Sequence, residues 1–308
     1  MVDSSLRLHK LRRKYLTAYG AKKILLKACS YLFLLEFAFI FLLPFITILT
    51  KSPKTMQDIL NPVIVWLPAH VRLENFADAF HILNYGRTFF NSLFFSAIPT
   101  FLQIFTCALC GYALGKYRFF GNKLIYLLVL LTIFIPPQTV VISRYVMYSW
   151  FSFINTPWPL LLPELFGHGL RGGLFVLIYS QFFKTMPKSL DESARIDGAK
   201  PLRIFFSIAM PLAKPAIVLV TIFSFVWHWN DSYSSSMFMM NSAAMPAIVK
   251  FESLFDPRMA SFQGGNPMFS NDAIKMACAL LIVLPLIIMY MIVQRQFTES
   301  IERTGLVE

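Results

Sequence analysis

The residue types that could do chemistry are few in this chain, and most stand alone. Cys107 and Cys110 form a CxxC pair, the spacing of metal and redox sites, but neither a second pair nor a histidine lies near them. Because both sit in an apolar run, we interpret them as small packing residues. Gly115-Lys116 is followed by Tyr117, so it is not the GxxxxGK(S/T) loop that cradles nucleotide phosphates. The sequence therefore predicts a non-catalytic chain with no metal site and no ATP hydrolysis of its own.

Aromatic and amide side chains in the apolar runs suit a different chemistry, the binding of a sugar. Trp227, Trp229 and Asn230 combine flat apolar faces with an amide that can bond hydroxyl groups. Asn91 and Gln103 are two further amides that could line a substrate path. Each has a structural alternative. The tryptophans can form an aromatic belt at a membrane interface, which we favour, and Gln103 can bond across helices.

The composition of the chain is that of a membrane protein. It has 308 residues, of which 56% are hydrophobic and 14% charged, and its mean hydropathy is +0.60. A soluble domain carries about 25% charged residues, so these values indicate a polytopic protein in contact with lipid. The net charge of +12 would suit a nucleic-acid partner, but lysine and arginine also crowd the cytoplasmic loops of membrane proteins. Their clustering favours the second explanation, and we expect no nucleic-acid partner.

Six apolar runs predict an all-α membrane protein with six transmembrane helices. They cover residues 28–50, 88–114, 123–143, 171–186, 212–230 and 273–294. Six spans place both termini on one side, and most of the 28 Lys and Arg residues fall in the segments of that side. By the positive-inside rule that side is the cytoplasm. We expect three parts: a basic N-terminal segment 1–27, a spanning domain 28–294 and a cytoplasmic tail 295–308.

Three features interrupt this pattern. Glu36 lies inside the first predicted span, where an ionisable group is a functional candidate, although it can also sit near a helix end or pair with a neighbouring helix. Pro136-Pro137 must kink or break the third span, because proline removes a backbone donor and clashes with the preceding turn. Residues 144–170 are rich in proline and aromatic side chains and predict a loop.

The most strongly punctuated polar stretch is 187–215, between the fourth and fifth spans. Ser189 and Glu192 form a capping box, which predicts a helix start. Gly198 supplies the left-handed residue that ends this helix after about two turns, and Pro201 opens a second helix. A helix this short is not stable alone in water. We expect a groove in another protein to receive it, since its acidic residues oppose an anionic lipid surface.

The same stretch carries a family resemblance. Residues 192–199 read ESARIDGA, and with Pro211 and Pro215 they resemble the EAA loop of bacterial ABC-importer permeases. Ser193 stands where alanine is usual, a change between two small residues. The chain is also similar to the carbohydrate-uptake branch of these permeases, and most to the six-helix permease of maltose-type transporters. The residues that carry this similarity are Asn91-Ser92, Gly111-Tyr112-Ala113, Gln181-Phe182-Phe183, Trp229-Asn230-Asp231 and Gly305.

The resemblance implies a type I importer fold in the bacterial cell membrane, together with a set of partners. These are a second, different permease, two cytoplasmic ATPase subunits that bind ATP and Mg²⁺, and an extracellular solute-binding protein. The EAA loop would form a coupling helix that sits in a cleft of an ATPase and moves when the ATPase dimer closes. Carried onto this sequence, the coupling residues are Glu192, Ser193, Ala194, Asp197, Gly198 and Ala199.

The expected function is that of a permease subunit for ATP-driven import of a carbohydrate, an oligosaccharide by the resemblance. Two alternatives stay open. One is a permease of the same class that carries a non-sugar solute. The other is an ATP-independent secondary carrier, which would need charge relays within the spans. Glu36 is the only acidic residue clearly inside a predicted span, which disfavours the carrier.

Overall fold

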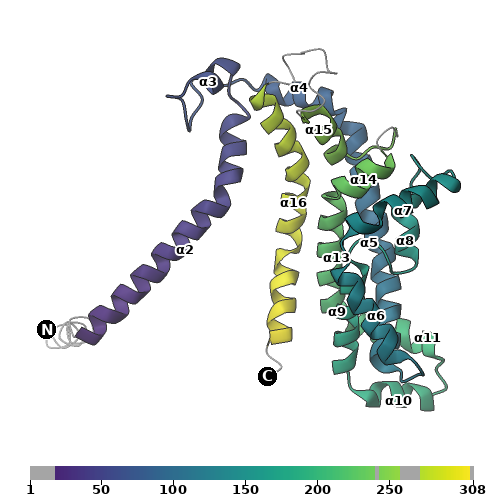
Figure 1. Ribbon diagram of the computed structural model, residues 1–308. Coiled ribbons are helices and arrows are strands. Elements are labelled where there is room, and N and C mark those ends of the chain that lie inside the picture. The colour runs from purple at the N-terminus through teal and green to yellow at the C-terminus, as the bar shows by residue number, and fades with distance from the viewer. Residues whose placement is uncertain (1–17, 240–242, 257–270, 306–308) are drawn as a thin grey trace, which may run out of the picture.

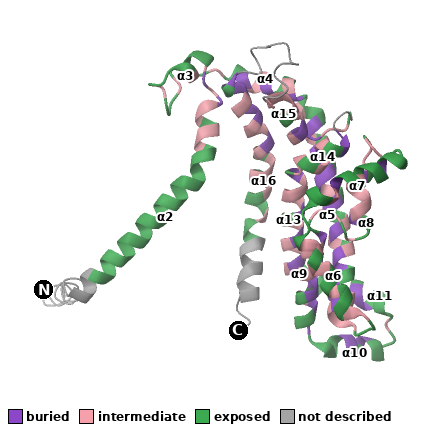
Figure 2. Cartoon of the chain, viewed as in Figure 1, coloured by how far each residue is buried: buried purple, intermediate pink, exposed green. Residues whose placement is uncertain are grey.

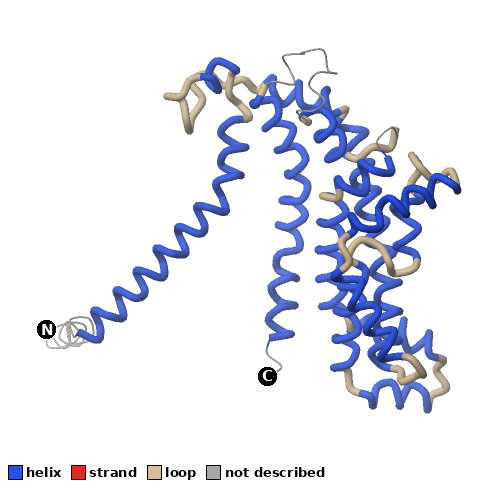
Figure 3. The backbone as a smooth tube through the Cα atoms, viewed as in Figure 1, coloured by secondary structure: helices blue, strands red, loops and turns tan. Residues whose placement is uncertain are grey.

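The computed structural model describes residues 18–239, 243–256 and 271–305, and nearly all of that part is helical. Figure 3 shows helices joined by short loops and no strand in the described residues; their nearest approach to a sheet is one isolated bridge between Lys54 and Val71. The predicted all-α class is confirmed. Helices form throughout because intrahelical hydrogen bonds satisfy every backbone group without water.

Three helices are long and apolar enough to cross a membrane. They are residues Lys22–Lys51 of α2 (Ala18–Lys51), the whole of α5 (Tyr85–Lys116) and residues Asp272–Arg295 of α16 (Asp272–Gly305). The first, second and sixth predicted spans therefore have matching helices. The short helices α3 (Met56–Leu60) and α4 (Glu74–Leu83) lie between α2 and α5.

The third and fifth predicted spans are not straight helices. The chain turns by 99° between α6 (Asn122–Phe134) and α7 (Pro137–Trp150), at the diproline that was predicted to break it. It turns by 79° between the segment Pro201–Leu212 and α13 (Lys214–Trp229). Pro215 contributes to the second bend, because it cannot donate a backbone hydrogen bond to the preceding turn.

The fourth predicted span is α9 (Gly172–Thr185), which has only 14 residues. At 1.5 Å per residue it is about 21 Å long, shorter than a hydrocarbon layer of about 30 Å. By length and apolarity the described chain has three spans, or up to five if each bent pair counts as one. The prediction of six spanning helices is thus matched only in part. The inward placement of both termini stays a prediction.

The predicted loop 144–170 is largely helical, which corrects the sequence interpretation. α7 continues to Trp150, and α8 (Trp158–Leu165) follows after a short turn. Both helices have proline in the first turn, where its missing N–H costs nothing and its fixed φ suits a helix. Pro137 thus ends one helix and begins the next, and Pro159 lies in the first turn of a helix where the sequence had predicted a loop.

Helix α5 is the central element of the bundle. It packs along α9 and α13, and the largest apolar core lies between these helices, around Cys107, Tyr112, Phe175, Tyr179 and Val220. Cys107 is thus a packing residue, as predicted, while Cys110 of the same CxxC pair is exposed. The remaining elements are α10 (Lys188–Ile196), α11 (Pro201–Ile204), a π-helical turn (Phe205–Ala209), α12 (Met210–Leu212), α14 (Ser232–Met239) and α15 (Ala247–Phe255).

Helix α2 stands apart from this bundle (Figure 1), and Figure 2 shows it exposed along nearly its whole length. Glu36 lies on this exposed surface, and no ion pair joins it to another described residue. Pairing of Glu36 with a helix of another subunit, or a functional role for it, stays a prediction. The long exposed part of this apolar helix presents its surface to lipid or to another subunit.

Candidate functional site

Helices α10 and α11 lie at one end of the bundle, the end where α2 begins and α16 finishes (Figure 1). α10 starts at Lys188 after Pro187, whose extended backbone separates it from α9. No side chain caps this start, so the predicted capping box of Ser189 and Glu192 is wrong. Ser189 lies inside the first turn, because the helix begins two residues earlier than the box requires.

The end of α10 is formed as predicted. Gly198 has φ +78°, in the left-handed region where side chains are penalised. Its N–H donates to the carbonyl of Arg195 at 3.0 Å, and the N–H of Ala199 donates to the carbonyl of Ala194 at 2.9 Å. These two bonds form a Schellman motif, which closes the last turn of the helix and reverses the chain. The short helix therefore has a rigid end.

One face of α10 packs on the bundle and the other is exposed. Asp191 and Ala194 face the bundle, and the Asp191 carboxylate forms an ion pair of 2.9 Å with Lys116 at the end of α5. Ile196 is 86% exposed on the opposite face. The exposed part of the helix also includes Glu192, Ser193 and Asp197. An exposed isoleucine flanked by acidic side chains is a surface that a protein partner can cover.

Ala194 does not fit its expected contact with an ATPase. It is 8% exposed and lies on the inner face of α10, so it packs against the rest of the bundle. Arg195 lies 5.5 Å from the ring of Tyr117 in a cation–π contact, a second link between α10 and the chain that follows α5. Of the predicted coupling residues, five remain at least partly exposed: Glu192, Ser193, Asp197, Gly198 and Ala199.

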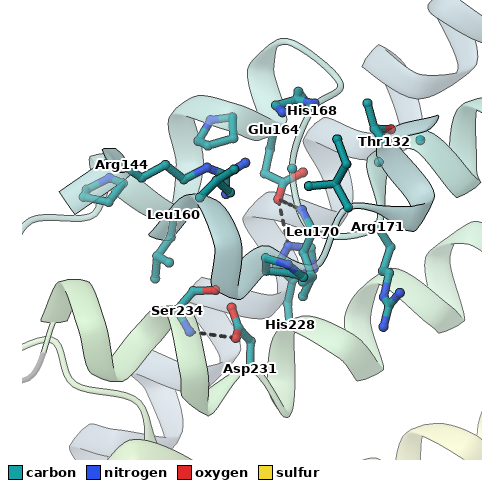
Figure 4. Close-up of a pocket in the computed structure, with 18 of the residues that line it drawn as sticks. Thr132, Arg144, Leu160, Glu164, His168, Leu170, Arg171, His228, Asp231 and Ser234 are labelled. Atoms are coloured by element: carbon teal, nitrogen blue, oxygen red, sulfur yellow. Dashed lines mark hydrogen bonds and ion pairs between the residues drawn. The ribbon is translucent and has the colours of Figure 1, made fainter. Parts of the chain in front are cut away.

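A cavity of about 270 Å³ lies at the other half of the bundle, between α7, α8, α13 and α14 (Figure 4). Its ionisable lining residues are Arg144, Glu164, His168, Arg171, His228 and Asp231. Figure 4 shows Arg144 reaching in from α7, while Glu164 lies near His228. Ionisable side chains among apolar helices make this cavity a candidate functional site.

Glu164 and His228 form a pair within this wall, with side chains only 3% and 6% exposed. The Glu164 Oε1 atom lies 3.0 Å from His228 Nε2 and accepts the N–H of Leu170 at 2.9 Å. His228 Nδ1 lies 2.8 Å from the carbonyl oxygen of Ser224 and 3.3 Å from the hydroxyl oxygen of the same residue. The pair joins helix α8 to helix α13.

Gln103 belongs to the same network of hydrogen bonds. Its amide nitrogen donates to the carbonyl of Leu170 at 2.8 Å, and its oxygen accepts the Ser224 hydroxyl at 2.6 Å. Thr100 lies 3.0 Å from the same hydroxyl. The structural alternative for Gln103, bonding across helices, is confirmed. These bonds tie α5, α13 and the turn after α8 together in the middle of the bundle.

The other predicted substrate residues also have structural contacts. Trp229 is 2% exposed, and its Nε1–H donates to the carbonyl of Ile282 in α16 at 3.1 Å. It therefore packs between helices, where neither substrate nor a lipid interface reaches it. Asn91 binds the segment before α15, and the exposed Asn230 donates to the carbonyl of Val226 in its own helix at 2.8 Å.

Sequence reasoning missed Glu164, His228, Lys116 and Asp191 as structural or functional residues. Glu164 and His228 interrupt apolar runs, so the rule that ionisable residues inside membrane segments are functional would have found them. The signal was present in WPLLLPEL and FVWHW. The Lys116–Asp191 ion pair has no such signal, because its partners lie on different helices and both appear in loop-like polar sequence.

The substitution Gly169→Ala tests the contact between Glu164 and His228. A Cβ atom at Gly169 would overlap the carboxyl group of Glu164, so we expect Gly169→Ala to displace that carboxylate from His228 and Leu170. The expected result is a clear loss of thermal stability of the purified protein, of about 1–3 kcal/mol, the cost of a buried polar group left without its partner. In a Glu164→Ala background, where the space is vacant, Gly169→Ala should cost much less. Equal costs in both backgrounds would contradict this contact.

Comparison with known proteins decides the family. The model of the family described as "Binding-protein-dependent transport system inner membrane component" matches residues 87–303. The chain belongs to this family. It is therefore a multi-pass inner-membrane component of a binding-protein-dependent transport system, and the resemblance to ABC-importer permeases is confirmed.

Named relatives of this transport-component family include carbohydrate permeases. The melibiose/raffinose/stachyose import permease protein MelC of Bacillus subtilis (strain 168) is 30% identical over 256 residues, covering 83% of this chain and 87% of the relative. The polygalacturonan/rhamnogalacturonan transport system permease protein YtcP of the same organism is 28% identical over 276 residues, covering 88% and 94%.

A solved structure shares the fold of this chain. The crystal structure of a bacterial ABC transporter involved in the import of the acidic polysaccharide alginate includes a chain that matches with a TM-score of 0.78 and 20% identity. The match covers 91% of this chain and 99% of that one. At this identity the likeness establishes the permease fold, and it confirms the fold expected from the EAA resemblance.

Proposed function

We propose that this chain is one of two different permease subunits of an ATP-driven importer for an oligosaccharide. Two cytoplasmic ATPase subunits and an extracellular solute-binding protein complete the system, and ATP and Mg²⁺ bind to the ATPases. The observation that supports the proposal best is α10, a short helix with a rigid glycine end and an exposed acidic and apolar face. A helix of this length needs a receiving surface.

In this proposal α10 and its glycine turn sit in a cleft of an ATPase through Glu192, Ser193, Asp197, Gly198 and Ala199. ATP-driven closure of the ATPase dimer pulls this unit and switches the permease between outward and inward access. α10, both chain ends and the tail then lie in the cytoplasm. The basic residues of 1–27 and 184–214 support that orientation.

The carbohydrate cargo is supported by the names of the relatives, which import raffinose-type sugars or polygalacturonan. Within this chain the cavity beside α7 and α8 is the best candidate for contact with the cargo. Arg144, His168 and Ser234 line it and offer donors for hydroxyl oxygens. The pair of Glu164 and His228 shapes its wall. A non-sugar solute is the alternative cargo.

Reconstitution of the complete complex in proteoliposomes tests the proposal. With ATP and the loaded binding protein, we expect uptake of an oligosaccharide such as raffinose or a galacturonate oligomer. Without ATP, or with an ATPase variant that cannot hydrolyse it, uptake should fall to background. Uptake that persists without ATP would favour a secondary carrier. Uptake of amino acids or ions in place of sugars would overturn the carbohydrate assignment, but the assignment as an ATP-driven importer would stand.

A further inference from the structure

The chain that follows the turn at Gly198 has the opposite charge to α10. α10 and its C-cap carry three acidic residues, whereas residues 200–214 carry three cations and no acidic residue. The cations of this basic segment are Lys200, Arg203 and Lys214. All three are exposed, and none forms an ion pair with another described residue. The two adjacent segments therefore suit partners of opposite charge, and the function proposed above uses only α10.

The basic segment lies nearly at right angles to the helix that follows it. Its helical stretch Pro201–Leu212, made of α11, the π-helical turn and α12, is bent by 79° from α13. Because α13 belongs to the fifth predicted span, a stretch at this angle runs nearly parallel to the membrane surface. Figure 1 shows α11 beside the bundle, at the end where α10 lies. This is the orientation of a helix that lies in the interface of a bilayer.

The inner face of the basic segment fixes its depth. Phe205 is 1% exposed, and its ring centroid lies 5.3 Å from that of Tyr112 in α5 and 6.4 Å from that of Phe183 in α9. Tyr112 and Phe183 lie near the ends of their helices, which finish at Lys116 and Thr185. The segment is therefore held at the level where two predicted spans end.

The outer face of the basic segment exposes apolar side chains. Leu202, Phe206 and Leu212 are 61%, 54% and 48% exposed. Leu202 and Phe206 are four residues apart and so lie on one side of the segment, and the cation Arg203 is next to Leu202. Exposed apolar side chains beside unpaired cations are typical of a surface that enters the headgroup layer of an anionic bilayer.

We propose that the basic segment 200–214 is a binding site for anionic phospholipid. Its three exposed apolar side chains insert between the lipid chains, and its three cations bind the phosphate groups. Near an anionic bilayer surface each cation contributes about fivefold to the affinity. Binding holds the start of α13 at the interface, beside α10. In the function proposed above this site faces the cytoplasmic leaflet, but the binding of lipid does not depend on transport.

Fluorescence quenching tests whether lipid covers the basic segment. A bimane group is attached to Phe206→Cys in the complete complex, with the exposed Cys29 and Cys110 replaced by serine. The complex is placed in vesicles of phosphatidylcholine and phosphatidylglycerol. We expect brominated lipids to quench the bimane group and iodide in the water not to. If Phe206→Cys does not assemble, Leu202→Cys offers a second exposed position in the same segment.

The variant Ile196→Cys is the matched control. Ile196 is also apolar and is 86% exposed, but it lies on the neighbouring α10 with its acidic side chains. Brominated lipid should therefore not quench a bimane group at this position. Equal quenching by lipid at positions 196 and 206 would contradict the proposal, because the basic segment would then have no contact with lipid that α10 lacks.

The preference for anionic lipid tests the three cations. At position 206, brominated phosphatidylglycerol should quench at least about fivefold more effectively than brominated phosphatidylcholine. The variant Lys200→Gln with Arg203→Gln and Lys214→Gln should lower this preference to near one, whereas Lys200→Arg with Lys214→Arg should keep it. If the triple variant does not assemble, high salt should weaken the preference of the unsubstituted segment, because salt screens exposed charges.

Three outcomes at position 206 overturn the lipid site. Iodide quenches the bimane group, or neither quencher reaches it because another subunit covers the segment, or the two lipids quench it equally. None of these measurements includes a transport step. Failure of the proposed function would instead appear as a wild-type complex without ATP-dependent uptake, and the quenching by lipid would remain.

Discussion

Gly198→Asp is expected to reduce substrate uptake roughly tenfold or more, because the turn after α10 cannot keep its shape with a side chain there. Gly198 has φ +78°, and a side chain in the left-handed region costs about 1–2 kcal/mol. The new carboxylate also lies next to Asp197 at the C-terminal end of a helix, where the macrodipole disfavours negative charge. Uptake into cells and co-purification of the ATPase with the permease measure the effect.

Gly121→Asp is the matched control for this variant. Gly121 has φ +83°, and no atom lies within 4 Å of the position of a Cβ there, so the backbone penalty is similar. It precedes α6, outside the unit that binds the ATPase in our proposal. We expect this variant to retain most of its uptake. Full uptake with normal ATPase co-purification in Gly198→Asp would contradict the proposed coupling role of α10.

Gly111→Ala is expected to lower the stability of the chain strongly. The added methyl group would lie 2.6 Å from Tyr179 Cβ, 2.9 Å from the backbone nitrogen of Ser180 and 3.0 Å from the carbonyl oxygen of Val176. None of these atoms is the flexible end of a side chain, so α5 and α9 must separate. Overpacking of this kind costs about 1–3 kcal/mol. A large fall in Tm and in the yield of folded protein should follow.

Gly86→Ala is the control in the same helix. No atom lies within 4 Å of the Cβ position at Gly86, in the first turn of α5, so alanine fits there. Since alanine favours helix over glycine by about 1 kcal/mol, this variant should have an unchanged or slightly raised Tm. Equal Tm values for the Gly86, Gly111 and wild-type proteins would show that the approach of α5 to α9 tolerates an extra carbon.

The sequence by itself determined the properties that depend on neighbouring residues. Uninterrupted apolar runs predicted the membrane class and the three long helices, because length and apolarity are local quantities. The diproline at 136–137 predicted the break between α6 and α7, and Gly198 predicted the end of α10. The ESARIDGA pattern identified the family before any contact was known. In each case the physical cause lies within a few residues of the feature.

Only the tertiary structure decided which side chains meet. Lys116 and Asp191, Glu164 and His228, and Asn91 and the segment 243–247 are contacts between distant parts of the chain. A membrane helix that is apolar on nearly every face has no polar stripe to show which side turns inward. The rotation of each helix about its axis is set by packing against its neighbours.

For the same reason the sequence left the roles of Trp229 and Gln103 open. Both could be assigned to a substrate path from their residue types, but the packing of α13 against α16 and α5 buries them and satisfies their hydrogen bonds. The types of these side chains describe what they can bind. The arrangement of the helices decides what they do bind. In this protein it turns α5 from one apolar span among several into the element that contacts both α10 and α15.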